Sequence, residues 1–228
     1  IILSKIIVKH YPVKNNNYHD VCNDVINAIR DDQQFLRAVT SKNGDFSFLR
    51  RLTRYRYNNL PLDQDGFHIY VKDGKTVWNP GWQPTKTKLD KYECRHGLGY
   101  TVITGTKNQV TVKQEMYVPK YDNILLNRVT LTNNSNKTKT LDLFSFVEFC
   151  LWDANDDTTN FQRNYSTGEV EVVGSKIFHK TEYRERRNHY SVFYANKKVD
   201  SFDTSRNDFM GVYGSPAMPE AVKNGKCK

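Results

Sequence analysis

VTVKQEMYV, at residues 110–118, is the stretch that decides the fold class. Its apolar side chains share one parity: Val110, Val112, Met116 and Val118. Polar side chains take three of the alternate positions. Because successive side chains of a β-strand point to opposite faces, this alternation predicts a strand with one face in a core and the other in solvent.

The stretches that follow repeat the pattern. Residues 124–131 predict a second strand, and residues 141–149 predict a third, with Leu141, Leu143, Val147 and Phe149 on one face. A polar cluster at 133–137 separates them, so we expect a hairpin.

Further short strands are expected at 169–173, 176–179 and 190–194, separated by glycines. Many short strands with turn residues between them are typical of sandwiches. The sequence therefore predicts a mainly β fold, a large antiparallel β-sandwich. Helix is expected mainly within residues 1–40, where Asp20–Val39 has apolar residues at helical spacing.

The composition fits a folded domain. Of 228 residues, 38% are hydrophobic and 13% aromatic, which favours a packed core and strands. No apolar run approaches the roughly 20 residues that cross a bilayer, and the opening residues lack a signal-peptide pattern. We therefore expect a cytoplasmic protein with no membrane partner, whose cysteines (Cys22, Cys94, Cys150 and Cys227) are reduced.

Lysine and arginine outnumber aspartate and glutamate by 34 to 25, a formal charge of +9. Two segments concentrate this charge. Arg50–Asn59 alternates arginine with tyrosine, which suits either a surface for polyanions or sugars or a strand at an interface. His179–Tyr190 mixes both signs, which suits either nucleic acid or ion pairs within the protein. We favour the interface and the ion pairs.

Two further segments contain reactive or ligating side chains. In Tyr92–Tyr100, Cys94 and His96 could form a thiol nucleophile or a metal site, but a buried cysteine and a hydrogen-bonded histidine near a glycine turn are the more ordinary interpretation. Cys150–Asn164 holds three aspartates and could bind calcium, yet it lacks the glycine and glutamate of an EF-hand. A polar loop that carries recognition groups fits it better. We expect no metal and no cofactor.

Several segments, taken in order, make the chain resemble the cellobiose and cellodextrin phosphorylases. The segments are LTRYRYNN at 52–59, WQPT at 82–85, YECRHGLGYT at 92–101, FSFVEFCLWDA at 144–154, TNFQRNYSTGEVEV at 159–172 and FHKTEYRERRNHY at 178–190. The resemblance covers residues 41–228, whereas residues 1–40 match poorly.

This resemblance implies a domain plan and a reaction. Such enzymes have an N-terminal super-sandwich of the galactose-mutarotase type, a helical linker and an (α/α)6 barrel. They split β-1,4-glucosides with phosphate, with inversion, and release glucose 1-phosphate. The general acid lies in the barrel, and phosphate itself is the nucleophile. We expect the chain to be the sandwich portion, incomplete at its C-terminus, without the barrel, and inactive alone. No residue is therefore assigned as catalytic.

The resemblance also implies one functional element within the sandwich. The Gln-Arg pair of the TNFQR loop reaches the neighbouring subunit's site near the acceptor sugar, and here that pair is Gln162 and Arg163. The expected partners are a β-glucoside disaccharide or cellodextrin, inorganic phosphate as co-substrate, and a second copy in a homodimer. Nucleic acid is not expected. Two alternatives are a free-standing basic nucleic-acid-binding module and an inactive remnant of a truncated gene.

Overall fold

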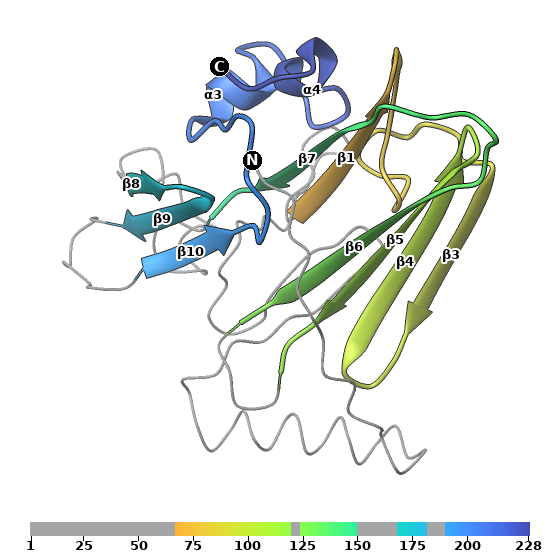
Figure 1. Cartoon of the computed structure of the whole chain (residues 1–228). Helices are drawn as coiled ribbons and strands as arrows, with labels where there is room; N and C mark the ends of the chain where they lie inside the picture. Colours follow the sequence, from red (N-terminus) through yellow and green to blue (C-terminus); the bar gives the residue numbers. More distant parts are fainter. Residues whose placement is uncertain (1–66, 120–123, 150–167, 182–189) are drawn as a thin grey trace.

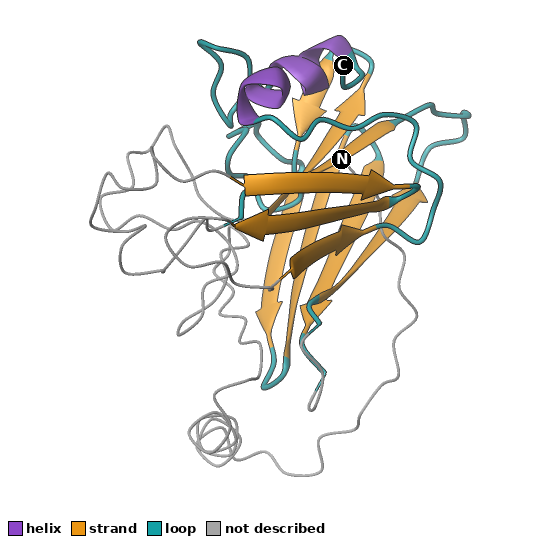
Figure 2. Cartoon of the chain, turned by 90° about the vertical axis from the view of Figure 1, so that its left-hand side faces the viewer, coloured by secondary structure: helices purple, strands orange, loops and turns teal. Residues whose placement is uncertain are grey.

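The computed structural model describes residues 67–119, 124–149, 168–181 and 190–228, which form three antiparallel sheets (Figures 1 and 2). The expected mainly β, antiparallel architecture is confirmed within these residues. The helix expected over Asp20–Val39 lies outside the described residues.

The largest sheet has the strand order β3-β4-β5-β6. Its strands are Lys91–His96, Tyr100–Lys107, Val110–Tyr117 and Leu126–Asn133. Residues 110–117 form the third of them, and Val110, Val112 and Met116 of the predicted apolar parity are buried, whereas Val118 follows the strand and is half-buried. β4 and β5 are joined by a two-residue turn in which Asn108 and Gln109 have φ of 49° and 61°. Positive φ at both positions matches the right-handed twist of the paired strands.

The second sheet has the order β2-β1-β7, with strands Thr76–Trp78, Phe67–Asp73 and Asp142–Val147. Here the hairpin prediction was wrong. β6 pairs with β5, whereas β7 pairs with β1 in the other sheet. The polar cluster after β6 therefore leads the chain from one sheet to the other. Alternation predicts which side chains share a face, but it does not identify the strand that pairs.

The main core lies between these two sheets. Val112, Met116 and Ile103 of the four-stranded sheet pack with Val71 and Trp78 of the other. Apolar burial of this kind is the dominant favourable term in folding. The predicted face of residues 141–149 is confirmed in part, because Leu141, Leu143 and Val147 contact this core, whereas Phe149 lies beyond the end of β7.

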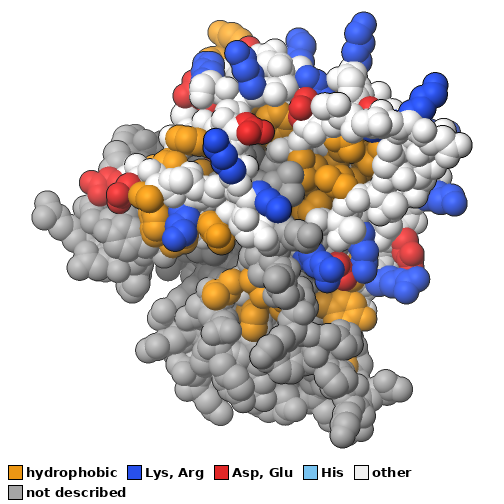
Figure 3. Space-filling model, in the orientation of Figure 1, with side chains coloured by type: hydrophobic (Ala, Val, Ile, Leu, Met, Phe, Trp, Pro, Cys, Tyr) orange, Lys and Arg blue, Asp and Glu red, His pale blue; other side chains and the backbone are white. Residues whose placement is uncertain are grey.

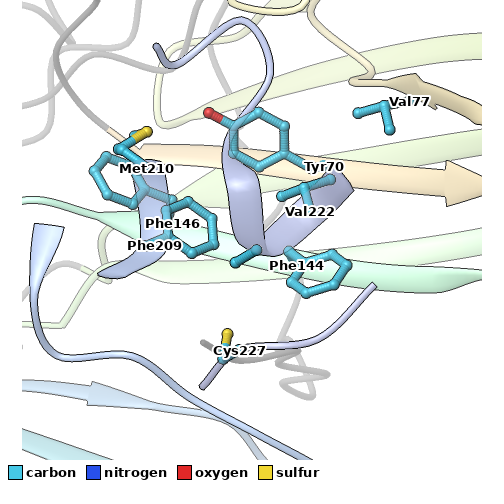
Figure 4. Packing of buried hydrophobic residues seen from close by; sticks show 9 residues of the cluster. Tyr70, Val77, Phe144, Phe146, Phe209, Met210, Val222 and Cys227 are labelled. Carbon is cyan, nitrogen blue, oxygen red and sulfur yellow. The ribbon is translucent and has the colours of Figure 1, made fainter. Parts of the chain in front are cut away.

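A second core covers the opposite face of β1 and β7. Two short helices, α3 (Arg206–Met210) and α4 (Glu220–Asn224), place Phe209 and Val222 against Tyr70, Phe144 and Phe146 (Figure 4). Neither α3 nor α4 was predicted, since helix was expected mainly in residues 1–40. Five residues are too few to show helical periodicity.

The third sheet has the order β10-β9-β8, with strands Tyr190–Tyr194, Lys176–Thr181 and Gly168–Val173. These confirm the three short strands predicted last along the sequence. Phe193 meets Phe67 edge-on at 6.0 Å, which joins this sheet to the end of β1. Among the described residues, no helix is long and apolar enough to cross a membrane.

Candidate functional site

A cleft of about 280 Å³ is lined by residues at the end of β7, in the sheet of β8, β9 and β10, and in the chain leading into α3. Its lining includes Phe146, Glu148 and Phe149 from β7 and the residues after it. His179 of β9 and Arg206 of α3 complete its polar part. The cleft therefore combines three elements that are far apart in sequence.

Aromatic rings form much of the cleft wall. Phe146 stacks on Phe209 with ring centroids 5.2 Å apart and planes 12° apart. Phe149 stacks on His179 at 5.1 Å. Stacked rings of this kind add stabilisation beyond the area that they bury. The two stacked pairs connect the end of β7 to α3 and to β9.

One ion pair lies at the cleft. Arg206 Nε is 3.3 Å from Glu148 Oε2, and the two side chains are 35% and 17% exposed. Arg206 is the first residue of α3, and Ser205 Oγ accepts a hydrogen bond from the Asp208 amide to cap that helix. Because the pair is partly shielded from water, its attraction is less screened than that of a surface pair.

His179 is the titratable ring of the cleft. On β9, Ile177 and His179 share the inward parity, and both are buried. Burial lowers the pKa of His179, because a low-dielectric environment disfavours the charged imidazolium. The ring is therefore neutral at neutral pH, a state in which one nitrogen donates and the other accepts.

The cleft suits a polar, uncharged ligand. It offers aromatic faces, a carboxylate, a guanidinium and a neutral imidazole. Ligand sites are mostly apolar with a few placed polar groups, and sugar hydroxyls can donate and accept. The arrangement offers recognition, and we assign it no bond-breaking step.

The predicted acceptor residues Gln162 and Arg163 lie outside the described residues. The two ends of the segment that contains them are described. The chain leaves at Phe149 and returns at Gly168, two residues before Val170, and both Phe149 and Val170 line the cleft. The described residues on both sides of positions 150–167 therefore line the cleft.

The side chains of Cys94 and His96 are in contact, because residues two apart on a strand share a face. The Sγ of Cys94 is 3.3 Å from Nε2 of His96, whose Nδ1 is 3.1 Å from Oγ1 of Thr101. The ordinary interpretation was right that His96 is hydrogen-bonded, but wrong that the cysteine is buried. Cys94 is half-buried and His96 is exposed, since β3 lies at the edge of its sheet.

The other candidate segments are described only in part. Arg50–Asn59 and Cys150–Asn164 lie outside the described residues, as does the middle of His179–Tyr190. The ends of the last segment fall in β9 and β10, which pair with each other. Within the described part of the chain, no group of three or more histidine, cysteine or acidic residues could hold a metal ion.

The cleft itself was not predicted from the sequence. Glu148 carried the one available signal, because it places a charge between Val147 and Phe149 at the end of an apolar strand. Arg206 gave no signal, since only the packing of α3 brings it to the cleft.

Comparison with known proteins gives consistent matches. The model of the glycosyl hydrolase 94 supersandwich domain matches residues 38–228. An N,N'-diacetylchitobiose phosphorylase of Vibrio furnissii is 30% identical over 217 residues, which cover 86% of this chain and 26% of that protein. A solabiose phosphorylase of Paenibacillus borealis is 30% identical over 165 residues, covering 70% of this chain and 21% of that protein. The chain thus spans about a quarter of the length of these relatives.

Proposed function

This chain belongs to the glycosyl hydrolase 94 family through its supersandwich domain, and we propose that it is the non-catalytic sandwich part of a disaccharide phosphorylase. The complete enzyme would cleave a glycosidic bond with inorganic phosphate. Two relatives are named for phosphorolysis of diacetylchitobiose and of solabiose, so a disaccharide is the substrate class we propose. A β-1,4-glucoside such as cellobiose is our first choice within it.

We further propose that the sandwich contributes to substrate binding through segment 150–167. Gln162 and Arg163 would reach the acceptor sugar in the neighbouring subunit of a homodimer. The observation that supports this is that the described residues on either side of the segment, Phe149 and Val170, line the cleft.

The chemistry of Arg163 fits this role. A guanidinium offers five donors in a fixed fork, so it can bind two neighbouring sugar hydroxyls at once. A hydrogen bond with one charged partner contributes about 1.5–3 kcal/mol, which is about tenfold to a hundredfold in affinity.

The test is Arg163→Ala in the dimeric protein that includes the catalytic domain. In the synthetic direction, KM for the acceptor sugar should rise about tenfold to a hundredfold, while KM for glucose 1-phosphate stays unchanged. The matched control is Arg128→Ala, which removes an exposed arginine of β6 that pairs with Glu115 at 3.7 Å. This control should change neither constant.

A structural role for Arg163 predicts a different result. If Arg163 only pairs with Asp156 or Asp157 to hold its segment, the variant would lose dimer or stability, and the remaining dimer would keep its acceptor KM. Sedimentation measured beside the kinetics separates the two. An unchanged acceptor KM in intact dimer would overturn the assignment.

The proposal also predicts that this 228-residue chain alone makes no glucose 1-phosphate from cellobiose and phosphate, because the family resemblance places the general acid in the barrel. The assay is product formation against a blank without protein. Turnover clearly above that blank would contradict the non-catalytic role.

A further inference from the structure

Tyr92, Cys94 and His96 project from the same face of β3, the strand at the edge of the four-stranded sheet. Residues two apart on a strand share a face, so the three form a row. The row opposite them on β4 is Gly105, Ile103 and Thr101. Both rows belong to the face that also carries the main core, and Cys94 packs against that core with one side.

The two rows place a thiol (Cys94), a base (His96) and a hydroxyl that orients the base (Thr101) next to one another. His96 lies directly opposite Thr101 in the strand register, and its Nδ1 is 3.1 Å from the Thr101 hydroxyl. When that nitrogen donates to the hydroxyl, Nε2 keeps its lone pair and faces the Cys94 thiol at 3.3 Å. A nucleophile beside a base that a third group holds in place is the signature of an activated side chain.

The scaffold keeps this geometry in place. The Gly97 amide donates to the Tyr100 carbonyl at 2.8 Å, which closes the turn between β3 and β4. Six consecutive residue pairs then join the two strands. The paired strands β3 and β4 therefore fix the positions of His96 and Thr101.

Tyr92 and Glu93 are the side chains on β3 near Cys94 that can carry a negative charge. Burial, followed by the neighbouring Cys94, raises the pKa of Tyr92 to about 12, so the phenol beside the thiol stays uncharged at neutral pH. Glu93 lies on the opposite face of β3, where it pairs with Arg95. Neither residue therefore places an unneutralised negative charge against the sulfur.

Cys227 provides the contrast within the same chain. It is 5% exposed, and burial raises the pKa of its thiol to about 11. A thiolate is the reactive form of cysteine, so this thiol should be inert. Cys94 is half-buried and beside an imidazole, which is the environment in which reactive cysteines are found.

We propose that Cys94 is a site of thiol–disulfide exchange with low-molecular-weight disulfides. His96 Nε2 takes the thiol proton, and the Cys94 sulfur attacks one sulfur of the disulfide. The S–S bond of the small disulfide breaks, a mixed disulfide forms on Cys94, and the other half leaves as a thiolate that takes up a proton. The disulfide is the oxidant, and a reducing thiol reverses the step.

The experiment exposes the full chain to glutathione disulfide at pH 7 and quenches it with acid at intervals. Peptide mass mapping then gives the rate at each cysteine. A free thiol is only a few per cent thiolate at pH 7, so activation can raise the rate by at most about thirtyfold. We expect Cys94 in the folded protein to react about tenfold faster than in the same protein in urea, with Cys227 unreactive until the protein unfolds.

Variants then test the two assigned partners. His96→Ala should slow the reaction of Cys94 about tenfold. Thr101→Val removes the hydroxyl at nearly constant volume and should slow it as well, whereas Thr101→Ser keeps the hydroxyl and should retain the rate. Continued protection of Cys227 shows that each variant is folded.

Either of two results would overturn the proposal. One is a folded wild-type protein in which Cys94 reacts no faster than in urea, a measurement that needs no variant. The other is a folded His96→Ala variant that retains the wild-type rate. The proposal is independent of the phosphorylase role, since neither measurement uses a sugar substrate.

Discussion

At the scale of single residues, His179 makes the stability of the cleft depend on pH. Burial holds its pKa below the value of about 6.5 that a histidine has in an unfolded chain. As pH falls below 6.5, the unfolded chain binds a proton at this residue before the folded chain does. The contribution of His179 is therefore complete above that pH and is lost as pH falls toward the lowered pKa.

We expect the free energy of unfolding to decrease between pH 7 and pH 5, and His179→Gln to reduce that decrease. Urea unfolding at several pH values measures it. The variant also loses the stacking on Phe149, so the comparison rests on the slope against pH, and the value at pH 8 reports the packing loss. An unchanged slope would show that His179 does not titrate differently in the two states.

At the scale of elements, a glycine sets how closely the chain after β2 approaches the large sheet. A Cβ on Gly105 would lie 2.7 Å from the Pro80 carbonyl oxygen and 2.8 Å from its Cα. Both are backbone atoms, so the loop cannot give way by a side-chain rotation. In the same part of the chain, Thr85 Oγ1 donates to Asn79 Oδ1 at 2.7 Å.

Gly105→Ala should therefore destabilise the protein by about 2 kcal/mol, within the usual cost of overpacking. Gly99→Ala is the matched control, because a Cβ there meets nothing within 4 Å. That variant should change stability by no more than about 0.5 kcal/mol. Thermal or urea unfolding of both variants provides the measurement, and equal stability of the two would contradict the close approach.

The short helix α3 depends on the side chain it buries. Phe209 is 1% exposed and contacts Tyr70 and Phe146, so Phe209→Ala should cost about 3–5 kcal/mol. Phe202, which is 39% exposed, is the control, and Phe202→Ala should cost clearly less. Urea unfolding distinguishes them. Similar losses would mean that α3 contributes little to the second core.

The whole molecule has a formal charge of +9, and among the described residues part of the positive charge is neutralised by ion pairs. On the face in Figure 3, lysine and arginine side chains are spread over several elements with acidic side chains among them. Many of the described cations are paired, as in Lys139 with Asp73 at 2.7 Å and Lys113 with Glu115 at 2.8 Å. Nucleic-acid sites instead gather unpaired cations into one patch or stripe.

We therefore expect only weak, nonspecific binding to duplex DNA or RNA, lost as salt rises to about 0.2 M. Fluorescence anisotropy across a salt series measures this. A dissociation constant in the nanomolar range at about 0.15 M salt would instead favour the nucleic-acid-binding alternative.

Sequence patterns alone predicted six of the strands, β5 to β10, and the side chains that share a face in β5 and β7, whereas β1 to β4 were not predicted individually. Period-two alternation is a property of a single strand, so Val110, Val112 and Met116 could be placed in a core before any partner was known. The order of short motifs along the chain indicated the family, and the family match over residues 38–228 confirmed it.

Strand pairing and the residues that the sheets enclose depend on the three-dimensional fold. Alternation carries no information about partners, so the pairing of β7 with β1 was missed. Glu148 and Arg206 are 58 residues apart and meet only because α3 packs on β7. The spacing of Cys94 and His96 on one face followed from the sequence. Their access to solvent did not, because it depends on β3 being the edge strand, which the order of the whole sheet sets.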